Sequence, residues 1–185
     1  MTPHPPTHLW QAAASLAARA HAGQRRKDGK TPYAAHPTRV ALTLTTVFGC
    51  NDEEILAAAL LHDVIEDTTV DYDDLLEHFG PRVADLVAAL SKDPRLVEAE
   101  RERRYDEQLA AAPWEARLIK LADVYDNLVD AHTDAARSKL AGKAARAIVL
   151  AQNDPPLEAA RTVVAALVEQ VKAEFGITPE TTPIA

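Results

Sequence analysis

The sequence predicts an all-α fold class, and three observations carry that prediction. The chain has 185 residues, of which 47% are hydrophobic but only 5% are aromatic. Ala and Leu make up most of the apolar share, and side chains without branching at Cβ suit closely packed helices better than sheets. Apolar residues also recur at helical spacing along most of the chain, between Gly and Pro residues that begin or end segments.

The first predicted helix follows the apolar face that runs from Leu9 to Ala20. A basic loop, GQRRKDGKTPY, comes after it. We predict a second helix with His36 as its N-cap, Pro37 at its first position and its end near Gly49. Its sequence VALTLTTVF also alternates as a strand would, so the assignment rests on the flanking signals.

Asn51 and Glu54 resemble a capping box, which opens a third helix that runs into LAAALLHDVIEDTT. The remaining predicted helices are Asp73–Phe79, Arg82–Leu90, Leu96–Ala111, Pro113–Asp130, Asp134–Gln152 and Pro156–Phe175. The tail TPETTPIA is expected to be loose. Because no repeat or long linker divides the chain, we expect a single domain over residues 1–185, with a motif core at about 17–130 and C-terminal helices at about 134–175.

The charge of the chain limits its partners. A formal net charge of −8 disfavours binding to nucleic acid or to an anionic membrane surface. The opening residues MTPHPPTHLW lack the features of a signal peptide, and no apolar run approaches the roughly 20 residues of a spanning helix. The single cysteine, Cys50, excludes an internal disulfide. We therefore expect a cytoplasmic protein whose ligand is a small molecule; its oligomeric state stays open.

The most hydrophobic segment of the chain ends in His62, Asp63, Glu66 and Asp67. The C-terminal end of a helix carries the negative pole of the helix dipole, which favours a cation. A bound divalent ion would neutralise the carboxylates and use the imidazole lone pair. The alternative is a solvated last turn, since an adjacent His-Asp pair occurs by chance in many chains.

Two further segments favour the metal. Asp123 has apolar neighbours in IKLADVYDN, and an aspartate in such surroundings is rarely buried unless it is paired or coordinates an ion. His36, at the start of its helix, can point a ring nitrogen away from that helix. With His62 and Asp63 they form a set of two histidines and two carboxylates. Such mixed ligands suit Mn²⁺, Fe²⁺, Co²⁺, Ni²⁺ or Zn²⁺ better than Mg²⁺ or Ca²⁺.

The ordered series AHAGQRRKDGKTPYAAHP, AAALLHDVIEDT, HFG and ARLIKLADVYDN resembles the hydrolase domain of the RelA/SpoT proteins. Within that group it looks most like the stand-alone small alarmone hydrolases of the Mesh1 type, which are HD-domain metal-dependent phosphohydrolases. The resemblance implies an HD-domain helical bundle and the activity of a guanosine-3′,5′-bis(diphosphate) 3′-pyrophosphohydrolase. Such an enzyme hydrolyses (p)ppGpp to GDP or GTP plus pyrophosphate, using a water that Mn²⁺ activates.

The resemblance also implies roles for individual residues. It assigns Mn²⁺ ligands to His36, His62, Asp63 and Asp123, a catalytic acidic pair to Glu66 and Asp67, and substrate contacts to Arg26, Lys27, Tyr33 and Asn127. The chemistry of these side chains agrees with such roles, because a carboxylate one turn from a metal ligand can accept or orient a proton of water. An arginine can hold phosphate oxygens through a bidentate fork.

The sequence also departs from its relatives and leaves alternatives open. After the family's Asn the long RelA/SpoT enzymes usually carry Arg and then Thr, whereas this chain has Val129 and Asp130. The same chemistry on (p)ppApp, on the 2′-phosphate of NADPH or on a nucleoside monophosphate is the first alternative. A metal-free nucleotide-binding module is the second, although no predicted ligand is missing.

Overall fold

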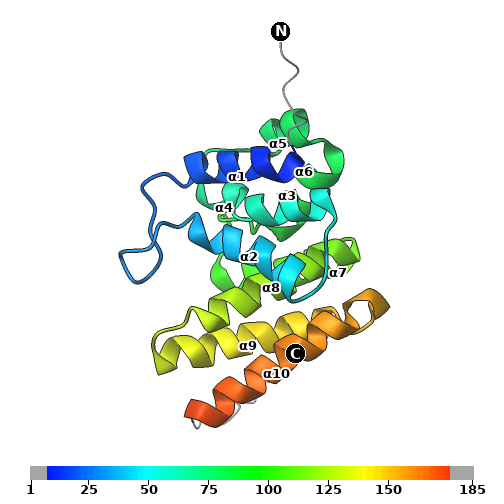
Figure 1. Cartoon of the computed structure of the whole chain (residues 1–185). Coiled ribbons are helices and arrows are strands. Elements are labelled where there is room, and N and C mark those ends of the chain that lie inside the picture. The colour runs from blue at the N-terminus through cyan, green and yellow to red at the C-terminus, as the bar shows by residue number, and fades with distance from the viewer. Residues whose placement is uncertain (1–7, 176–185) are drawn as a thin grey trace.

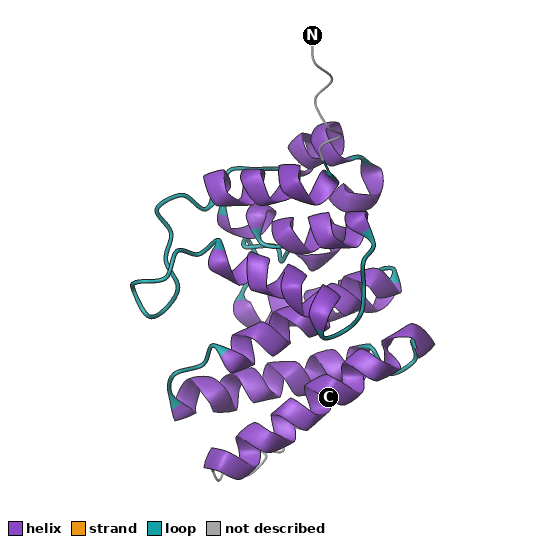
Figure 2. Ribbon diagram, in the orientation of Figure 1, coloured by secondary structure: helices purple, strands orange, loops and turns teal. Residues whose placement is uncertain are grey.

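A computed structural model describes residues 8–175, and every regular element within that range is a helix (Figures 1 and 2). In chain order the elements are α1 (Leu9–Ala20), α2 (Ala35–Thr46), α3 (Glu53–Leu61), α4 (Val64–Asp67), α5 (Tyr72–Phe79), α6 (Pro81–Leu90), α7 (Glu98–Ala111), α8 (Trp114–Val129), α9 (Asp134–Leu150), the 3₁₀ turn η1 (Pro155–Leu157) and α10 (Glu158–Phe175). The predicted all-α fold class is confirmed.

The helix α3 lies in the interior and organises one half of the fold. It packs against α1, α2 and α6. Six of its nine residues are buried, as expected for a helix that is apolar nearly all round. The helix α8 packs between α2 and α9, and α10 covers α9 at the end of the molecule opposite α1 (Figure 1). The buried helices α3 and α8 thus bring two segments of the predicted site into the core.

The second segment is a helix, which confirms the helical assignment over the strand-like alternation. The prediction that His36 is its N-cap is wrong, because Ala34 takes that position and His36 is the second helical residue. Pro37 therefore occupies the third position. Proline is tolerated there because the first turn of a helix leaves its N–H groups without intrahelical partners.

The predicted cap of the third helix is also wrong by one residue. Asp52 rather than Asn51 is the N-cap of α3, and its Oδ1 accepts hydrogen bonds from the N–H of Glu54 at 3.0 Å and of Ile55 at 3.1 Å. A carboxylate at this position interacts favourably with the helix dipole. Arg82 adds an ion pair to Asp52 Oδ2 at 3.0 Å.

The helix that enters the motif LLHDVIED does not run through it. The helix α3 ends at Leu61, and α4 begins again at Val64. His62 and Asp63 lie in the turn between them, where the His62 ring is 2.8 Å from the carbonyl oxygen of Ala59. The predicted helix that runs into the motif is therefore interrupted by a bend, which turns His62 and Asp63 inward.

The other predicted helices agree with the structure to within two residues at each end. The segment TPETTPIA lies outside the described residues. Among the helices of residues 8–175, none combines the length and the hydropathy that crossing a bilayer requires.

Candidate metal centre

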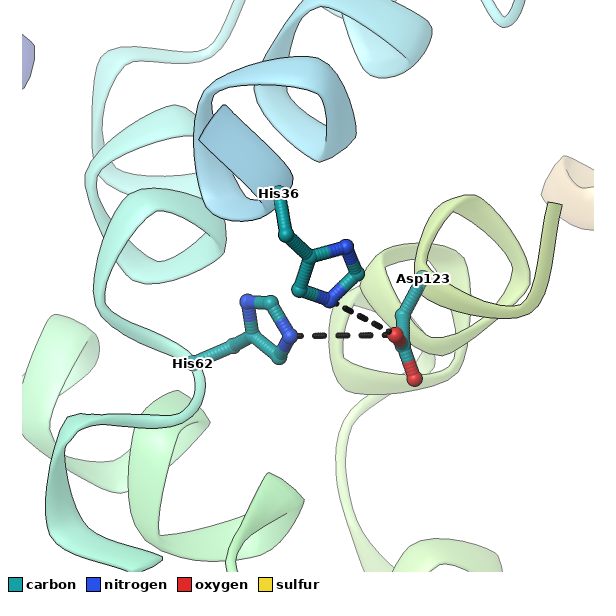
Figure 3. Close-up of side chains that lie close together, drawn as sticks. All are labelled: His36, His62 and Asp123. Atoms are coloured by element: carbon teal, nitrogen blue, oxygen red, sulfur yellow. Dashed lines mark ion pairs between the residues drawn. The ribbon is translucent and has the colours of Figure 1, made fainter. Parts of the chain in front are cut away.

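Three segments that are distant in sequence bring their side chains to one buried point. Ligand atoms of His36 on α2, His62 after α3 and Asp123 on α8 all lie within 4.8 Å of one another, and all three residues are buried (Figure 3). His36 Nε2 is 3.2 Å from Asp123 Oδ1, and His62 Nε2 is 3.8 Å from the same oxygen. Both imidazoles therefore point a nitrogen at one carboxylate.

Asp63 lies at the same point. Its Oδ2 is 3.0 Å from His62 Nε2 and 3.6 Å from His36 Nε2. The hydroxyl of Tyr33 donates a hydrogen bond of 2.6 Å to that oxygen. The four side chains predicted as metal ligands are thus neighbours in space.

These four side chains fit a divalent cation. His62 Nε2 is buried and lies 3.0 Å from Asp63 Oδ2, but the geometry of that contact is not that of a hydrogen bond, and no other described residue satisfies the nitrogen. Buried polar atoms are nearly always satisfied. Burial acts to lower the pKa of His62, but the carboxylates of Asp63 and Asp123 outweigh it and raise that pKa to about 9. A cation would satisfy the open ring nitrogen and the negative charge together.

The second nitrogen of each ring has a partner of its own. His62 Nδ1 faces a backbone carbonyl, that of Ala59. His36 Nδ1 instead lies 2.7 Å from Oδ2 of Asp126, and Arg39 donates to both oxygens of that carboxylate. Sequence reasoning missed Asp126 and Arg39. They are 87 positions apart, so no local spacing reveals their contact.

Lys120 is a third residue that sequence reasoning missed. Its Nζ donates to Asp123 Oδ2 at 2.7 Å. Burial acts to lower the pKa of Lys120, but the Asp123 carboxylate overcomes it and raises that pKa, so the lysine stays charged. The spacing of three positions on one helix was a signal that could have identified this pair.

The predicted catalytic carboxylates lie on the short helix α4 and face neighbouring segments. Oε2 of Glu66 accepts a hydrogen bond of 3.1 Å from the backbone N–H of Lys92. Partial burial raises the pKa of Glu66, and the nearby Asp63 carboxylate adds to this rise. Burial and Asp63 likewise raise the pKa of Asp67. Both groups are thus more basic than exposed carboxylates.

The basic loop is joined to α8 through Arg26. Its guanidinium donates to Asn127 Oδ1 and to Asp130 Oδ2, each at 2.9 Å, and its side chain is 14% exposed. The amide of Asn127 donates in turn to Asp123 Oδ1. Asp130 therefore connects the basic loop to the C-terminal end of α8.

Lys27 contrasts with Arg26. It is exposed and forms no side-chain hydrogen bond or ion pair with residues 8–175. The turn around it is ordered, because Asp28 accepts hydrogen bonds from the N–H groups of Lys30 and Thr31, and Gly29 adopts a φ of 69°. The ammonium group of Lys27 is thus presented on a defined turn.

A second group of cations lies beside Tyr105 on α7. The Nζ atoms of Lys92 and Lys120 lie 4.9 and 5.5 Å from the centre of its ring. A cavity of about 320 Å³ adjoins this ring and is also lined by Arg101 and Arg104. Four basic side chains therefore lie around Tyr105, and two of them, Lys92 and Lys120, are paired with the carboxylates of Glu102 and Asp123.

Comparison with known proteins gives one family and several relatives. The HD domain family matches residues 13–149. The human guanosine-3′,5′-bis(diphosphate) 3′-pyrophosphohydrolase MESH1 is 46% identical over 119 residues, which cover 64% of this chain and 66% of that protein. The enzyme of the same name from Drosophila melanogaster is 42% identical over 126 residues, which cover 68% of this chain and 70% of the relative.

A solved structure is also similar along nearly the whole chain. It is described as a metazoan ortholog of SpoT that hydrolyses ppGpp. The two structures have a TM-score of 0.78 and 30% sequence identity, and the match covers 95% of this chain and 100% of the other.

Proposed function

This chain belongs to the HD domain family, and from that premise we propose that it is a guanosine-3′,5′-bis(diphosphate) 3′-pyrophosphohydrolase. One observation carries the proposal: two imidazoles and the Asp123 carboxylate converge within 4.8 Å. The relatives that are 42–46% identical bear the name of this activity. The products are GDP or GTP and pyrophosphate.

We assign the metal ligands to His36, His62, Asp63 and Asp123, and the metal to Mn²⁺. The unsatisfied nitrogen of His62 and the two carboxylates beside it support this assignment. Two nitrogens and two carboxylate oxygens also suit Zn²⁺, Fe²⁺, Co²⁺ and Ni²⁺, so the donor set limits the metal to this group. A divalent ion held there would act as a Lewis acid and bring the pKa of a water close to neutrality.

Glu66 is the proposed general base, and Asp67 assists it. Water attacks the phosphorus next to the ribose 3′ oxygen, and the bond between that phosphorus and the 3′ oxygen breaks. The attacked phosphorus departs in pyrophosphate, and the 3′ oxygen takes up a proton to become the 3′-hydroxyl of GDP or GTP, which balances the proton removed from water. Glu66 takes the proton of the attacking water. Its raised pKa supports this role, because a base whose pKa lies nearer to the working pH transfers protons more effectively.

The cations around the cluster support a substrate with several negative charges. Arg26 is hydrogen bonded to Asn127, which contacts Asp123, and Lys120 contacts Asp123 directly. Lys27 follows Arg26 in the same loop and has no acidic partner among the described residues. We propose that Lys27 and the free edge of Arg26 bind phosphate oxygens, and that Tyr33 and Asn127 line the nucleotide pocket. The ion pair with Asp130 holds the Arg26 guanidinium in place before the substrate arrives.

The proposal is tested by product analysis with a panel of nucleotides. Purified protein loaded with Mn²⁺ is expected to release pyrophosphate from ppGpp, and Asp63→Ala protein is expected to release none. The panel also contains (p)ppApp, NADPH and nucleoside monophosphates. A metal-loaded protein that prefers an adenine nucleotide or a monoester would exclude ppGpp as the substrate while leaving the metal chemistry intact.

Lys27→Ala is expected to raise the KM for ppGpp about tenfold with little change in kcat. A hydrogen bond to a charged group contributes roughly 1.5–3 kcal/mol, and about 1.4 kcal/mol corresponds to a factor of ten. Lys30→Ala is the matched control, since Lys30 is another exposed lysine of the same turn. Steady-state kinetics in which both variants have the KM of the unmodified protein would remove Lys27 from the substrate site.

We also propose that the protein acts in the cytoplasm, where its nucleotide substrates occur. Cell fractionation with an antibody to the chain tests this expectation.

A further inference from the structure

The two histidines of the metal centre are held in unequal ways. Nδ1 of His62 is hydrogen bonded to a neutral group, the backbone carbonyl oxygen of Ala59. Nδ1 of His36 is instead hydrogen bonded to a carboxylate, at 2.7 Å from Asp126 Oδ2. Both members of the second pair are deeply buried, since 1% of the His36 side chain and 5% of the Asp126 side chain are exposed. The interaction is therefore poorly screened by solvent.

Arg39 fixes the Asp126 carboxylate in turn. Its Nε donates to Oδ1 at 2.6 Å and its terminal nitrogen donates to Oδ2 at 3.0 Å, which is a two-pronged fork. Such bidentate pairs restrict orientation as well as adding energy. The same guanidinium also lies 3.0 Å from Asp130 Oδ2. The carboxylate at 126 thus cannot rotate freely beside the ring.

The contacts of Asp126 join α2 and α8, the two helices that carry His36 and Asp123. His36 and Arg39 lie one turn apart on α2, while Asp126 lies three positions after Asp123 on α8. The contacts from α2 to Asp126 therefore bind the two helices at the point where His36 Nε2 and Asp123 Oδ1 are 3.2 Å apart.

We propose that Asp126, held by Arg39, is a positioning residue that sets the metal affinity of the site through His36. It accepts the proton of Nδ1, which leaves the lone pair on Nε2, and it fixes the plane of the ring toward Asp123. A carboxylate partner also makes an imidazole a stronger donor to a metal. This inference rests on the proposed function, because it assumes that His36 is a metal ligand.

The test compares two substitutions, each of which removes the carboxylate charge from an Arg–Asp pair that is joined by two hydrogen bonds. Asp126→Asn alters the contact to His36, while Arg39 keeps its ion pair with Asp130. Asp154→Asn is the matched control. Asp154 is held by Nε and a terminal nitrogen of Arg117 in the same two-pronged way, away from the histidines. Arg39→Gln is a second variant that leaves Asp126 in place but frees it to rotate.

Asp126→Asn is expected to raise the dissociation constant for Mn²⁺ by about 10- to 100-fold, as the loss of outer-shell partners does at other metal sites. Arg39→Gln is expected to raise it less, and Asp154→Asn not at all. At saturating Mn²⁺ the kcat of Asp126→Asn protein should approach that of the unmodified protein. ¹⁵N NMR of the metal-free protein should find the neutral His36 ring protonated at Nδ1, and find a mixture of tautomers in Asp126→Asn protein.

Two results overturn the inference. In the first, Asp126→Asn protein is folded and binds Mn²⁺ within twofold of the unmodified protein, with an unchanged tautomer. In the second, Asp154→Asn weakens metal binding equally, which would indicate a general loss of stability. Unmodified protein that binds no transition metal would overturn the proposed function, and this inference with it.

Discussion

Asp123→Asn protein is expected to bind no Mn²⁺ and to hydrolyse ppGpp at least about 1000-fold more slowly. Asp123 Oδ1 faces both imidazoles, so the substitution removes one of the two carboxylate charges that face the histidines. A bound metal ion contributes several kcal/mol to such reactions, and about 4 kcal/mol corresponds to a factor of 1000. Metal content by elemental analysis and pyrophosphate release are the two measurements.

This substitution also deprives Lys120 of its carboxylate partner, and removing one member of a buried ion pair destabilises a fold. His62→Gln separates the two effects, because it removes a ligand and leaves the Lys120–Asp123 pair intact. Asp85→Asn is the control for the change from carboxylate to amide, since Asp85 is exposed on α6 and contacts the hydroxyl of Tyr72. Full metal occupancy in folded Asp123→Asn protein would contradict the proposed ligand set.

Glu66→Gln is expected to lower kcat by about 10²–10⁴-fold, the usual contribution of a general base. The amide has nearly the shape of the carboxylate and can still accept the N–H of Lys92, so the fold and the KM should change little. Mn²⁺ affinity should also remain within about twofold, because Glu66 is not among the proposed ligands. A fall in kcat alone would assign Glu66 to proton transfer rather than to binding.

The control for this prediction is Glu77→Gln, an exposed glutamate on α5. Asp67→Asn is measured beside it, since the pKa of Asp67 is raised as well. If Glu66→Gln protein keeps its kcat while Asp67→Asn protein loses activity, the base is Asp67. If neither substitution lowers kcat, the proposed acidic pair has no catalytic role.

Several errors in the predicted elements have local causes. His36 and Pro37 were assigned to the edge of their helix, but proline is also compatible with the third position of the first turn. The cap of α3 moved from Asn51 to Asp52, where a carboxylate gains from both the helix dipole and Arg82. At α3 two neighbouring residues, Asn51 and Asp52, could cap the helix, and the contact with Arg82 favours Asp52.

The helical fold followed from the sequence alone, because helical periodicity and caps act between residues that are close in the chain. The four residues that the structure brings together, His36, His62, Asp63 and Asp123, were also named from the sequence as candidate ligands. An aspartate in an apolar helix, such as Asp123, also indicates that its buried carboxylate has a cation or a hydrogen-bond donor as a partner. The sequence could not name that partner. The Lys120 pair had a local signal, but the contact of Asp126 with His36 spans 90 positions.

Only the tertiary structure decided three things: the bend that turns His62 and Asp63 inward, the carboxylate behind His36, and the ion pairs that join Arg26 to Asn127 and Asp130. The physical reason is the same in each. These interactions depend on the packing of α2, α3 and the basic loop against α8, and the distance between atoms on different helices is not encoded in the spacing of residues along any one of them.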